Sequence, residues 1–575
     1  MAEDIAGEID KPKRWAIPFA SDMTEADVDA ILKIPPFSHI DPSAFSPLVP
    51  LRGLFLNDCR RQRYQRGDII MRAGDYGNSA FFIISGSTRL VLDSLDEGLL
   101  GRGTTQRKTF WQALSQLWKN PTLPEVQNLE HVQQDHRLGS RKKEGGRAHI
   151  FLQDVPHVLD EHRTARVEAG DFIGEVAALG RTERVGTYFA EEDCELLEIR
   201  WQGVRELRLR SPEIKAHIDR LYRERSLKRH LEQTPIFKHL SQEDLEKVAA
   251  QTQFLSFGTF EWFGSYKRLR EKDPADRLAA EPVIAHEDDY PNGIFLIRSG
   301  YARLSESYNH GEKTVSYLGK GQVFGYDEIC YNWLRGKSIP FGRTLRAVGY
   351  VDALFVPTAV VESFVLSKLD RARLSNNLPS PRIKSEASAY RQDAANKLSP
   401  NMLEFLVENR VINGTATMII DLERCTRCDD CVRACASTHN NNPRFIRHGL
   451  EMDGFMIANA CMHCADPVCM IGCPTGAIHR ETAHGQVVIN NETCIGCATC
   501  ANSCPYDNIQ MVLPHRPEGG LYYDKTTHLP IQKAAKCDLC HEQLSGPSCV
   551  RACPHDAMIR ADMRDVDALA TWFNK

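Results

Sequence analysis

Residues 425–435 read Cys425-Thr-Arg-Cys428-Asp-Asp-Cys431-Val-Arg-Ala-Cys435. Three more groups of four cysteines follow, so that sixteen of the nineteen cysteines in the 575-residue chain lie between positions 425 and 553. The later groups are Cys461, Cys464, Cys469 and Cys473; Cys494, Cys497, Cys500 and Cys504; and Cys537, Cys540, Cys549 and Cys553. A proline follows the last cysteine of each later group, which makes the four groups variants of one repeated motif.

The spacing of the four groups is typical of ligands to 4Fe-4S clusters, although the second and fourth groups have a longer gap before the third cysteine. Three thiolates spaced C-x2-C-x2-C wrap one face of a cubane, and a fourth cysteine after three more residues points to a neighbouring cluster. Because two motifs exchange their fourth cysteines and so hold two clusters, four motifs predict four 4Fe-4S clusters. Residues 477–479 and 487–489 flank a His484-Gly485 turn and predict a hairpin. The region is therefore expected to be an α+β double ferredoxin-like domain.

Two other kinds of site could use parts of this pattern. Zinc ribbons also contain C-x2-C pairs, but they use two separated pairs, often with histidine, rather than three cysteines in tandem followed by Cys-Pro. Cys537-Asp-Leu-Cys540-His541 spells a c-type haem attachment site, but the remaining cysteines and the proline of this group complete the ferredoxin pattern. His463 is expected to lie beside a cluster or at the surface rather than to bind iron.

Residues 417–563 resemble the iron-sulfur subunits of the molybdopterin oxidoreductase superfamily, which includes dimethyl sulfoxide reductase, formate dehydrogenase and nitrate reductase, and related hydrogenase subunits. The likeness rests on the motif at 425–435, on Cys461-Met-His-Cys464-Ala-Asp-Pro-Val-Cys469 and on Cys473-Pro-Thr-Gly-Ala-Ile478. The resemblance implies a catalytic partner of the molybdopterin or nickel-iron hydrogenase type, or another redox protein.

The same resemblance implies how the motifs pair to hold four clusters in a linear electron-transfer chain. The implied ligand sets are Cys425, Cys428 and Cys431 with Cys553; Cys537, Cys540 and Cys549 with Cys435; Cys461, Cys464 and Cys469 with Cys504; and Cys494, Cys497 and Cys500 with Cys473. Some family members lack a cysteine of the third motif and carry a 3Fe cluster. Cys497 is present here, which favours 4Fe-4S throughout.

The first two thirds of the chain contain an internal repeat. Ala80-Phe-Phe-Ile-Ile-Ser-Gly is similar to Gly293-Ile-Phe-Leu-Ile-Arg-Ser-Gly, and Gly170-Asp-Phe-Ile-Gly is similar to Gly321-Gln-Val-Phe-Gly. Alternating apolar and small residues with glycine at the corners predict short strands of a small β-roll. The sequence thus predicts two tandem jelly-roll domains before the cysteine-rich region.

Both copies resemble cyclic nucleotide-binding domains, as found in catabolite activator proteins and cyclic-nucleotide-dependent kinases. The resemblance implies that a short helix after Gly-Glu cradles the cyclic phosphate, that an arginine pairs with the phosphate, and that the glutamate accepts from the ribose hydroxyl. In the first copy these positions are Gly174, Glu175 and Arg184, followed by Thr187. The implied ligand is cyclic AMP or cyclic GMP.

The second copy departs from this motif. Gly325 is followed by Tyr-Asp before Glu328, and Arg346 stands where a small polar residue is expected. Nucleotide binding is therefore expected at the first copy rather than at the second. The alternative that both rolls are docking surfaces stays open.

The sequence predicts five segments. They are an N-terminal extension (1–23), a first cyclic nucleotide-binding-like domain (24–225) with an insertion at about 95–163, a second, degenerate one (231–369), a linker and helix (370–416), and the 4Fe-4S domain (417–575). Cys59, Cys194 and Cys330 stand apart from the clusters and are expected to be small buried hydrophobic residues.

Composition and motifs limit the function. A net charge of −5 provides no field to attract nucleic acid, and no apolar run approaches the 18 to 20 residues of a membrane span. No P-loop and no complete dinucleotide motif is present, so no catalytic residue is assigned. We expect a cytoplasmic electron-transfer subunit of an oxidoreductase complex, with its thiols kept reduced. The alternative is a signalling protein that responds to redox state and cyclic nucleotide.

Overall fold

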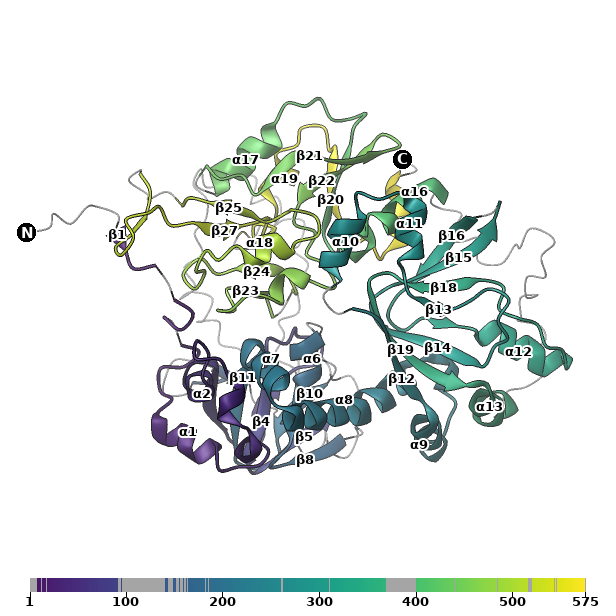
Figure 1. The fold of residues 1–575 in the computed structure, drawn as a ribbon, viewed down its shortest axis with the longest axis horizontal. Helices are drawn as coiled ribbons and strands as arrows, with labels where there is room; N and C mark the ends of the chain where they lie inside the picture. Colours follow the sequence, from purple (N-terminus) through teal and green to yellow (C-terminus); the bar gives the residue numbers. More distant parts are fainter. Residues whose placement is uncertain are drawn as a thin grey trace, which may run out of the picture.

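The chain folds into two β-sandwiches and a cysteine-rich domain in the computed structural model (Figure 1). The structure describes residues 8–11, 13–16, 18–91, 95, 140–142, 148–150, 155, 159, 162, 164–180, 183–184, 186–259, 262–309, 311–368, 400–439, 441–482, 484–514, 520–541, 543 and 546–573. We refer to residues 24–210 as the N-terminal sandwich, to 234–368 as the second sandwich, and to 400–573 as the cysteine-rich domain.

The N-terminal sandwich consists of two four-stranded sheets, in the orders β2-β11-β4-β9 and β3-β10-β5-β8. The strands are β2 (Cys59–Tyr64), β3 (Ile69–Met71), β4 (Ser79–Ser85), β5 (Ser87–Val91), β8 (Thr164–Glu168), β9 (Phe172–Ile173), β10 (Thr187–Ala190) and β11 (Cys194–Arg200). The helices are α1 (Glu25–Ile31), α2 (Leu51–Asp58), α6 (Glu175–Gly180) and α7 (Trp201–Arg210). Phe37, Phe82 and Phe172 pack edge to face in its core, where each ring is almost fully buried.

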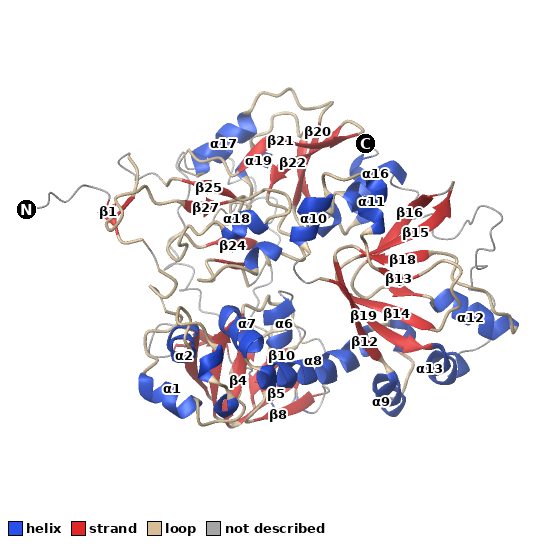
Figure 2. Cartoon of the chain, in the orientation of Figure 1, coloured by secondary structure: helices blue, strands red, loops and turns tan. Residues whose placement is uncertain are grey.

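The second sandwich repeats this topology strand for strand, with sheets β12-β19-β14-β17 and β13-β18-β15-β16. The strands are β12 (Gln253–Gly258), β13 (Val283–Ala285), β14 (Gly293–Ser299), β15 (Ala302–Tyr308), β16 (Gly311–Leu318), β17 (Val323–Phe324), β18 (Thr344–Ala347) and β19 (Tyr350–Pro357). The helices are α9 (Gln242–Gln251), α10 (Phe263–Leu269), α11 (Pro274–Ala279), α12 (Tyr326–Arg335) and α13 (Thr358–Val360). The two segments that repeat in the sequence are β4 and β14, and Figure 2 shows the strands of each sandwich with helices at their edges.

One long helix joins the two sandwiches. α8 (Pro212–Gln233) runs for 22 residues, and the Ser211 side chain caps its N-terminus by accepting from the Ile214 backbone N–H. The boundary that the sequence suggested between residues 225 and 231 falls inside this helix. The chain therefore passes from one sandwich to the next without an intervening loop.

The cysteine-rich domain is built on a four-stranded sheet in the order β21-β22-β20-β28, with two small two-stranded sheets beside it. The strands are β20 (Thr417–Asp421), β21 (Phe445–Met452), β22 (Phe455–Ala460), β23 (Ile478–Arg480), β24 (Val487–Ile489), β25 (Gln510–Val512), β27 (Lys533–Ala535) and β28 (Met558–Ala561). The helices are α16 (Pro400–Glu408), α17 (Asp430–Thr438), α18 (Thr499–Ser503), α19 (Ser548–Arg551) and α20 (Val566–Phe573). The helix expected within residues 370–416 corresponds to α16.

Contacts far apart in sequence join the domains. β1 (Glu8–Ile9) of the N-terminal extension pairs in parallel with β26 (Tyr523–Asp524), a contact that the sequence did not suggest. The second sandwich contacts the cysteine-rich domain through Trp262, whose indole N–H donates to the Asp466 carboxylate (3.0 Å), and through the Tyr317 hydroxyl, which donates to the carbonyl of Met563 (2.9 Å). The cysteine-rich domain thus contacts both the N-terminal extension and the second sandwich.

Two predicted segments are described only in part. Most of the insertion at 95–163 lies outside the described residues, apart from a hairpin of β6 (Ser140–Lys142) and β7 (Ala148–Ile150) and a few single positions. The linker residues 369–399 also lie outside the described residues. Among the helices that are described, none combines the length and the apolar character needed to cross a membrane.

Candidate metal centres

Two cavities in the cysteine-rich domain are each lined by four cysteines. The first thiol cavity is lined by Cys473, Cys494, Cys497 and Cys500. The second thiol cavity is lined by Cys461, Cys464, Cys469 and Cys504. Each cavity receives three thiols from one sequence motif and one thiol from another, which is the arrangement that two clusters sharing two motifs require.

Tight turns position the thiols of the first thiol cavity. Gly496 has a φ of +67°, and a Cβ at this position would lie 2.2 Å from the carbonyl oxygen of Gln532, so that no side chain fits there. Ala498 is also left-handed and precedes α18, which carries Cys500. On the other side of the cavity, Cys473 leads into the β23–β24 hairpin predicted from the sequence. Tight backbone turns and the apolar core that contains Cys473, Cys494 and Cys500 therefore together bring these thiols to one cavity.

The other eight cysteines lie around the four-stranded sheet. Cys431, Cys435, Cys537 and Cys549 are buried in one apolar core, and Cys425 and Cys553 pack against that core. Cys540 is buried, whereas Cys428 is exposed. α17 carries Cys431 and Cys435 about one turn apart, and it packs against α19, which carries Cys549. The structure thus brings the first and fourth motifs into one region of the domain.

The electrostatics of these thiols favour a cationic partner. Burial raises the pKa of the Cys500 thiol to about 12, and the neighbouring Cys473, Cys494 and Cys497 add to the shift. Burial also raises the pKa of Cys435 to about 12. Several thiols in one buried space cannot all ionise unless positive charge binds among them. Iron bound by thiolates supplies that charge, so each four-cysteine set fits a 4Fe-4S cluster.

In the N-terminal sandwich the structure brings two of the four expected nucleotide-site residues into contact. The Arg184 guanidinium, only 8% exposed, donates from Nη1 to the carbonyl of Gly174 (3.1 Å) and from Nη2 to the carbonyl of Ser79 (2.7 Å). Glu175 is buried at the start of α6. The Thr187 hydroxyl accepts from the backbone N–H of Ala73 (3.1 Å), so it stabilises a loop of the sandwich.

The corresponding region of the second sandwich has a different arrangement. Gly325 precedes α12 with a φ of +87°, and the buried ring of Phe341 lies against it. Arg346 forms an ion pair with Glu312 across the sheet. Burial raises the pKa of Glu328. Because an aromatic ring and an ion pair occupy this region, its polar groups differ from those of the first copy.

Comparison with known proteins shows which families the cysteine-rich region resembles. Residues 452–563 match the family model of the 4Fe-4S dicluster domain. The chain is 32% identical over 169 residues to electron transport protein HydN of Escherichia coli strain K12, a match that covers 27% of this chain and 91% of that protein. The chain belongs to the family of 4Fe-4S electron-transport proteins. It is also 30% identical over 194 residues to arsenate respiratory reductase iron-sulfur subunit ArrB of Shewanella sp. strain ANA-3, which covers 26% of this chain and 82% of that subunit.

Two further matches complete the comparison of this 4Fe-4S protein. One component of the anaerobic dimethyl sulfoxide reductase of Haemophilus influenzae is 34% identical over 172 residues, covering 26% of this chain and 74% of that protein. Residues 275–368 match the family model of the cyclic nucleotide-binding domain. The resemblances to 4Fe-4S iron-sulfur subunits and to a cyclic nucleotide-binding domain are confirmed for these two ranges of residues. The second match lies in the second sandwich, whose nucleotide-site residues depart from the motif.

Hydrogen bonds reach several sulfurs of the 4Fe-4S protein. The Arg560 guanidinium donates from Nη2 to the Cys537 sulfur (3.0 Å). Backbone N–H groups donate to sulfur in two of the Cys-Pro turns, from Asn508 to Cys504 (3.4 Å) and from Ala557 to Cys553 (3.3 Å). Hydrogen bonds to cluster sulfurs are among the factors that set the reduction potential of a 4Fe-4S cluster.

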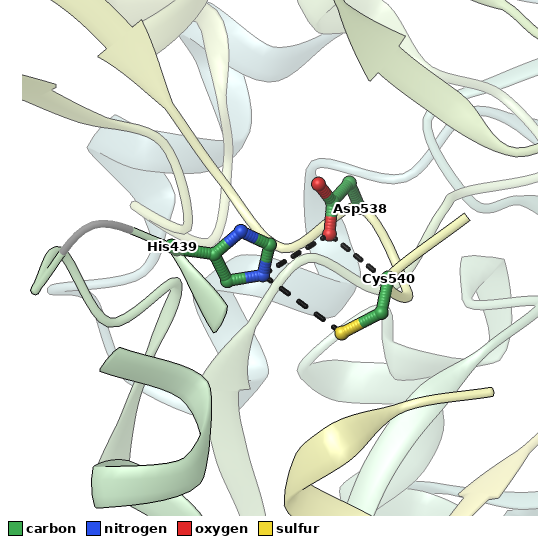
Figure 3. Close-up of side chains that lie close together, drawn as sticks. All are labelled: His439, Asp538 and Cys540. Atoms are coloured by element: carbon green, nitrogen blue, oxygen red, sulfur yellow. Dashed lines mark hydrogen bonds and ion pairs between the residues drawn. The ribbon is translucent and has the colours of Figure 1, made fainter. Parts of the chain in front are cut away.

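His439 lies beside the fourth motif in the structure, and the sequence did not predict this position. His439 lies with its Nε2 atom 3.5 Å from the Asp538 carboxylate and 3.8 Å from the Cys540 sulfur, and Figure 3 shows the three side chains facing one another. These three groups could also hold a metal ion. Because Cys540 already belongs to a four-cysteine set, we assign the grouping to the surroundings of that set.

His463 is fully buried rather than at the surface. Its Nδ1 accepts from the backbone N–H of Val487 in β24 (3.0 Å). Burial lowers its pKa, with the nearby Lys536 and Arg560 adding to the shift. The imidazole therefore links the second motif to the β23–β24 hairpin.

Proposed function

We propose that this protein is an electron-transfer iron-sulfur subunit that carries single electrons along four 4Fe-4S clusters between a catalytic oxidoreductase partner and an acceptor. The observation that carries the proposal is the pair of thiol cavities, each lined by three cysteines of one motif and one cysteine of another. That exchange of the fourth ligand is expected for clusters arranged in neighbouring pairs.

We propose the remaining two ligand sets from the first and fourth motifs. Their members are Cys425, Cys428, Cys431 and Cys553, and Cys537, Cys540, Cys549 and Cys435. A bound 4Fe-4S cluster supplies a one-electron carrier. The protein buries five of these eight thiols and donates hydrogen bonds to the sulfurs of Cys537 and Cys553, and both factors tune the reduction potential of a cluster.

The partner is proposed from the names of the relatives. Two of them are named as components of arsenate and dimethyl sulfoxide reductases. We propose a catalytic subunit of the molybdopterin or nickel-iron hydrogenase type for this chain as well. We also propose a cytoplasmic location, because free thiols persist in a reducing compartment.

We further propose that both sandwiches are cyclic nucleotide-binding-like jelly rolls and that the first binds cyclic AMP or cyclic GMP. The shared strand order of the two sandwiches and the family match of the second support the fold. The buried Arg184 supports an anion site in the first. In this proposal the nucleotide regulates electron transfer.

The decisive experiment is a metal count on the full chain reconstituted anaerobically. We expect about sixteen irons and sixteen sulfides per chain, four for each motif. Cys500→Ala is expected to lower the iron content, whereas Cys330→Ala, which alters a buried thiol of the second sandwich, is expected to leave it unchanged. A chain that takes up zinc but no iron would contradict the proposal.

A further inference from the structure

A third cavity lies between the N-terminal sandwich and the cysteine-rich domain. It has a volume of about 560 Å³ and is lined by residues of both domains. The sandwich contributes Phe81, Arg184 and Trp201, and the cysteine-rich domain contributes Thr475, His479 and Asn490. Cavities of about 300 to 1,000 Å³ are typical of sites for small organic ligands.

Several charged side chains line this interdomain cavity, and all but Arg184 form ion pairs: Arg60 pairs with Glu198, Arg72 with Asp75, and Arg200 with Asp58. The Arg184 guanidinium is buried, and although the carboxylates of Glu198, Glu175 and Asp75 act on it electrostatically, among the described residues none lies within ion-pair distance of it. Its two hydrogen bonds within the described part of the chain go to the backbone carbonyls of Gly174 and Ser79. Desolvation lowers its pKa. A buried guanidinium without a carboxylate partner is stabilised by an anion such as phosphate.

We propose that the interdomain cavity binds a phosphate-bearing ligand of mononucleotide size, with Arg184 at the phosphate and the cysteine-rich domain as the opposite wall. The aromatic side chains of Phe81 and Trp201 give the cavity apolar walls, with the Arg184 guanidinium over the Phe81 ring, and Thr475, His479 and Asn490 offer polar groups. This inference rests on the proposed function for its nucleotide class. The inference adds that the N-terminal sandwich alone does not form the complete ligand-binding site.

Hydrogen bonds hold the two walls together. The Asn78 side chain donates to the carbonyl of Arg480 (2.7 Å), and the Tyr76 backbone N–H donates to the carbonyl of Thr482 (2.9 Å). The Arg200 guanidinium donates to the carbonyl of Thr475 (3.1 Å). These partners lie on or beside the β23–β24 hairpin, so a ligand in the interdomain cavity contacts the segment that follows Cys473.

Thr475 connects the interdomain cavity to the metal centres. It lines both the interdomain cavity and the first thiol cavity, and its hydroxyl lies 3.7 Å from the Cys473 sulfur. An electron added at the first thiol cavity adds negative charge close to a bound phosphate. The ligand should therefore bind the oxidised protein more tightly than the reduced protein and lower the midpoint potential of that centre.

The test uses the full chain loaded with iron under anaerobic conditions and titrated with cyclic AMP, cyclic GMP and AMP by calorimetry. Arg184→Ala is expected to weaken binding at least about tenfold, because a hydrogen-bonded charge is lost. His479→Ala, which removes part of the opposite wall, is expected to weaken binding about threefold to tenfold. The matched control is His484→Ala, an exposed histidine on the turn of the same hairpin, which should bind as the unaltered chain does.

A second readout is the midpoint potential, followed by electron paramagnetic resonance during a redox titration with and without ligand. A threefold preference for the oxidised protein corresponds to a fall of about 28 mV for a one-electron couple, at about 59 mV per tenfold. An iron content equal to that of the unaltered chain shows that the cysteine-rich domain of each variant is folded, and an unchanged circular dichroism spectrum and unfolding midpoint show the same for the N-terminal sandwich.

The outcomes separate this inference from the proposed function. Weaker binding in both Arg184→Ala and His479→Ala supports the interdomain site. If Arg184→Ala loses binding but His479→Ala binds normally, the sandwich binds nucleotide by itself and the interdomain site is wrong. If no probe binds at millimolar concentration, the inference and nucleotide regulation are both wrong, while an iron count near sixteen still supports electron transfer.

Discussion

Replacing Arg560 by Gln should lower the midpoint potential of the centre that contains Cys537. The Arg560 guanidinium donates to the Cys537 sulfur (3.0 Å) and to the carbonyls of Ala416 (3.0 Å) and Cys461 (3.3 Å). Its positive charge favours the reduced state, which carries one more negative charge. Gln keeps part of the hydrogen-bonding capacity of Arg560 but removes the charge.

The size of the shift follows from Coulomb's law. For a charge separation of about 7 Å and an effective dielectric constant of about 20, one unit charge is worth about 2.4 kcal/mol. At about 2.3 kcal/mol per 100 mV, this corresponds to a fall of about 100 mV for a one-electron couple. Because Arg560 is partly buried, salt in the solvent should screen this interaction only weakly.

The assay is a redox titration of the anaerobic full chain followed by electron paramagnetic resonance. Arg560→Lys keeps the charge and should shift the potential by less than about a third of the Gln value. Arg551→Gln removes an exposed arginine that bonds to Gln543 rather than to sulfur, and it should have little effect. A shift below about 20 mV in Arg560→Gln, or a rise, would refute the reasoning.

Two further substitutions test the domain contacts and the cluster loops. Arg200→Met removes an ion-pair partner of the fully buried Asp58 and the hydrogen bond to the carbonyl of Thr475. The free energy of unfolding in urea should therefore fall by about 3 kcal/mol, and by less in Arg200→Lys. An unchanged unfolding midpoint would contradict this. Gly496→Ala places a Cβ 2.2 Å from the carbonyl oxygen of Gln532 and should lower the iron content, whereas a full iron content would show that the loop adapts.

The sequence alone determined the ligand-bearing part of the protein to a large extent. The first and last cysteines of each motif lie 10 to 16 positions apart in the sequence, so their chemistry can be read from local spacing. The hairpin that follows Cys473 was also predictable, since a His484-Gly485 turn between two apolar runs specifies it locally. Repeated strand patterns and glycine corners predicted a β-roll, the resemblance to a known family implied a cyclic nucleotide-binding fold, and the family match in the second sandwich agrees with it.

Only the tertiary structure decided which segments meet. Spacing within one motif predicts that its fourth thiol points to a neighbouring cluster, but it does not say which motif completes that cluster; the structure places Cys473 in one cavity with Cys500. The hydrogen bond between Asn78 and Arg480 joins residues 402 positions apart. His463 is buried, although a histidine between two cysteines could equally have been at the surface. Such contacts depend on how whole domains pack, and local sequence carries no record of that packing. For this reason the motif could suggest Arg184 as an anion-binding residue, but only the packing of the domains shows that Thr475 faces the same cavity.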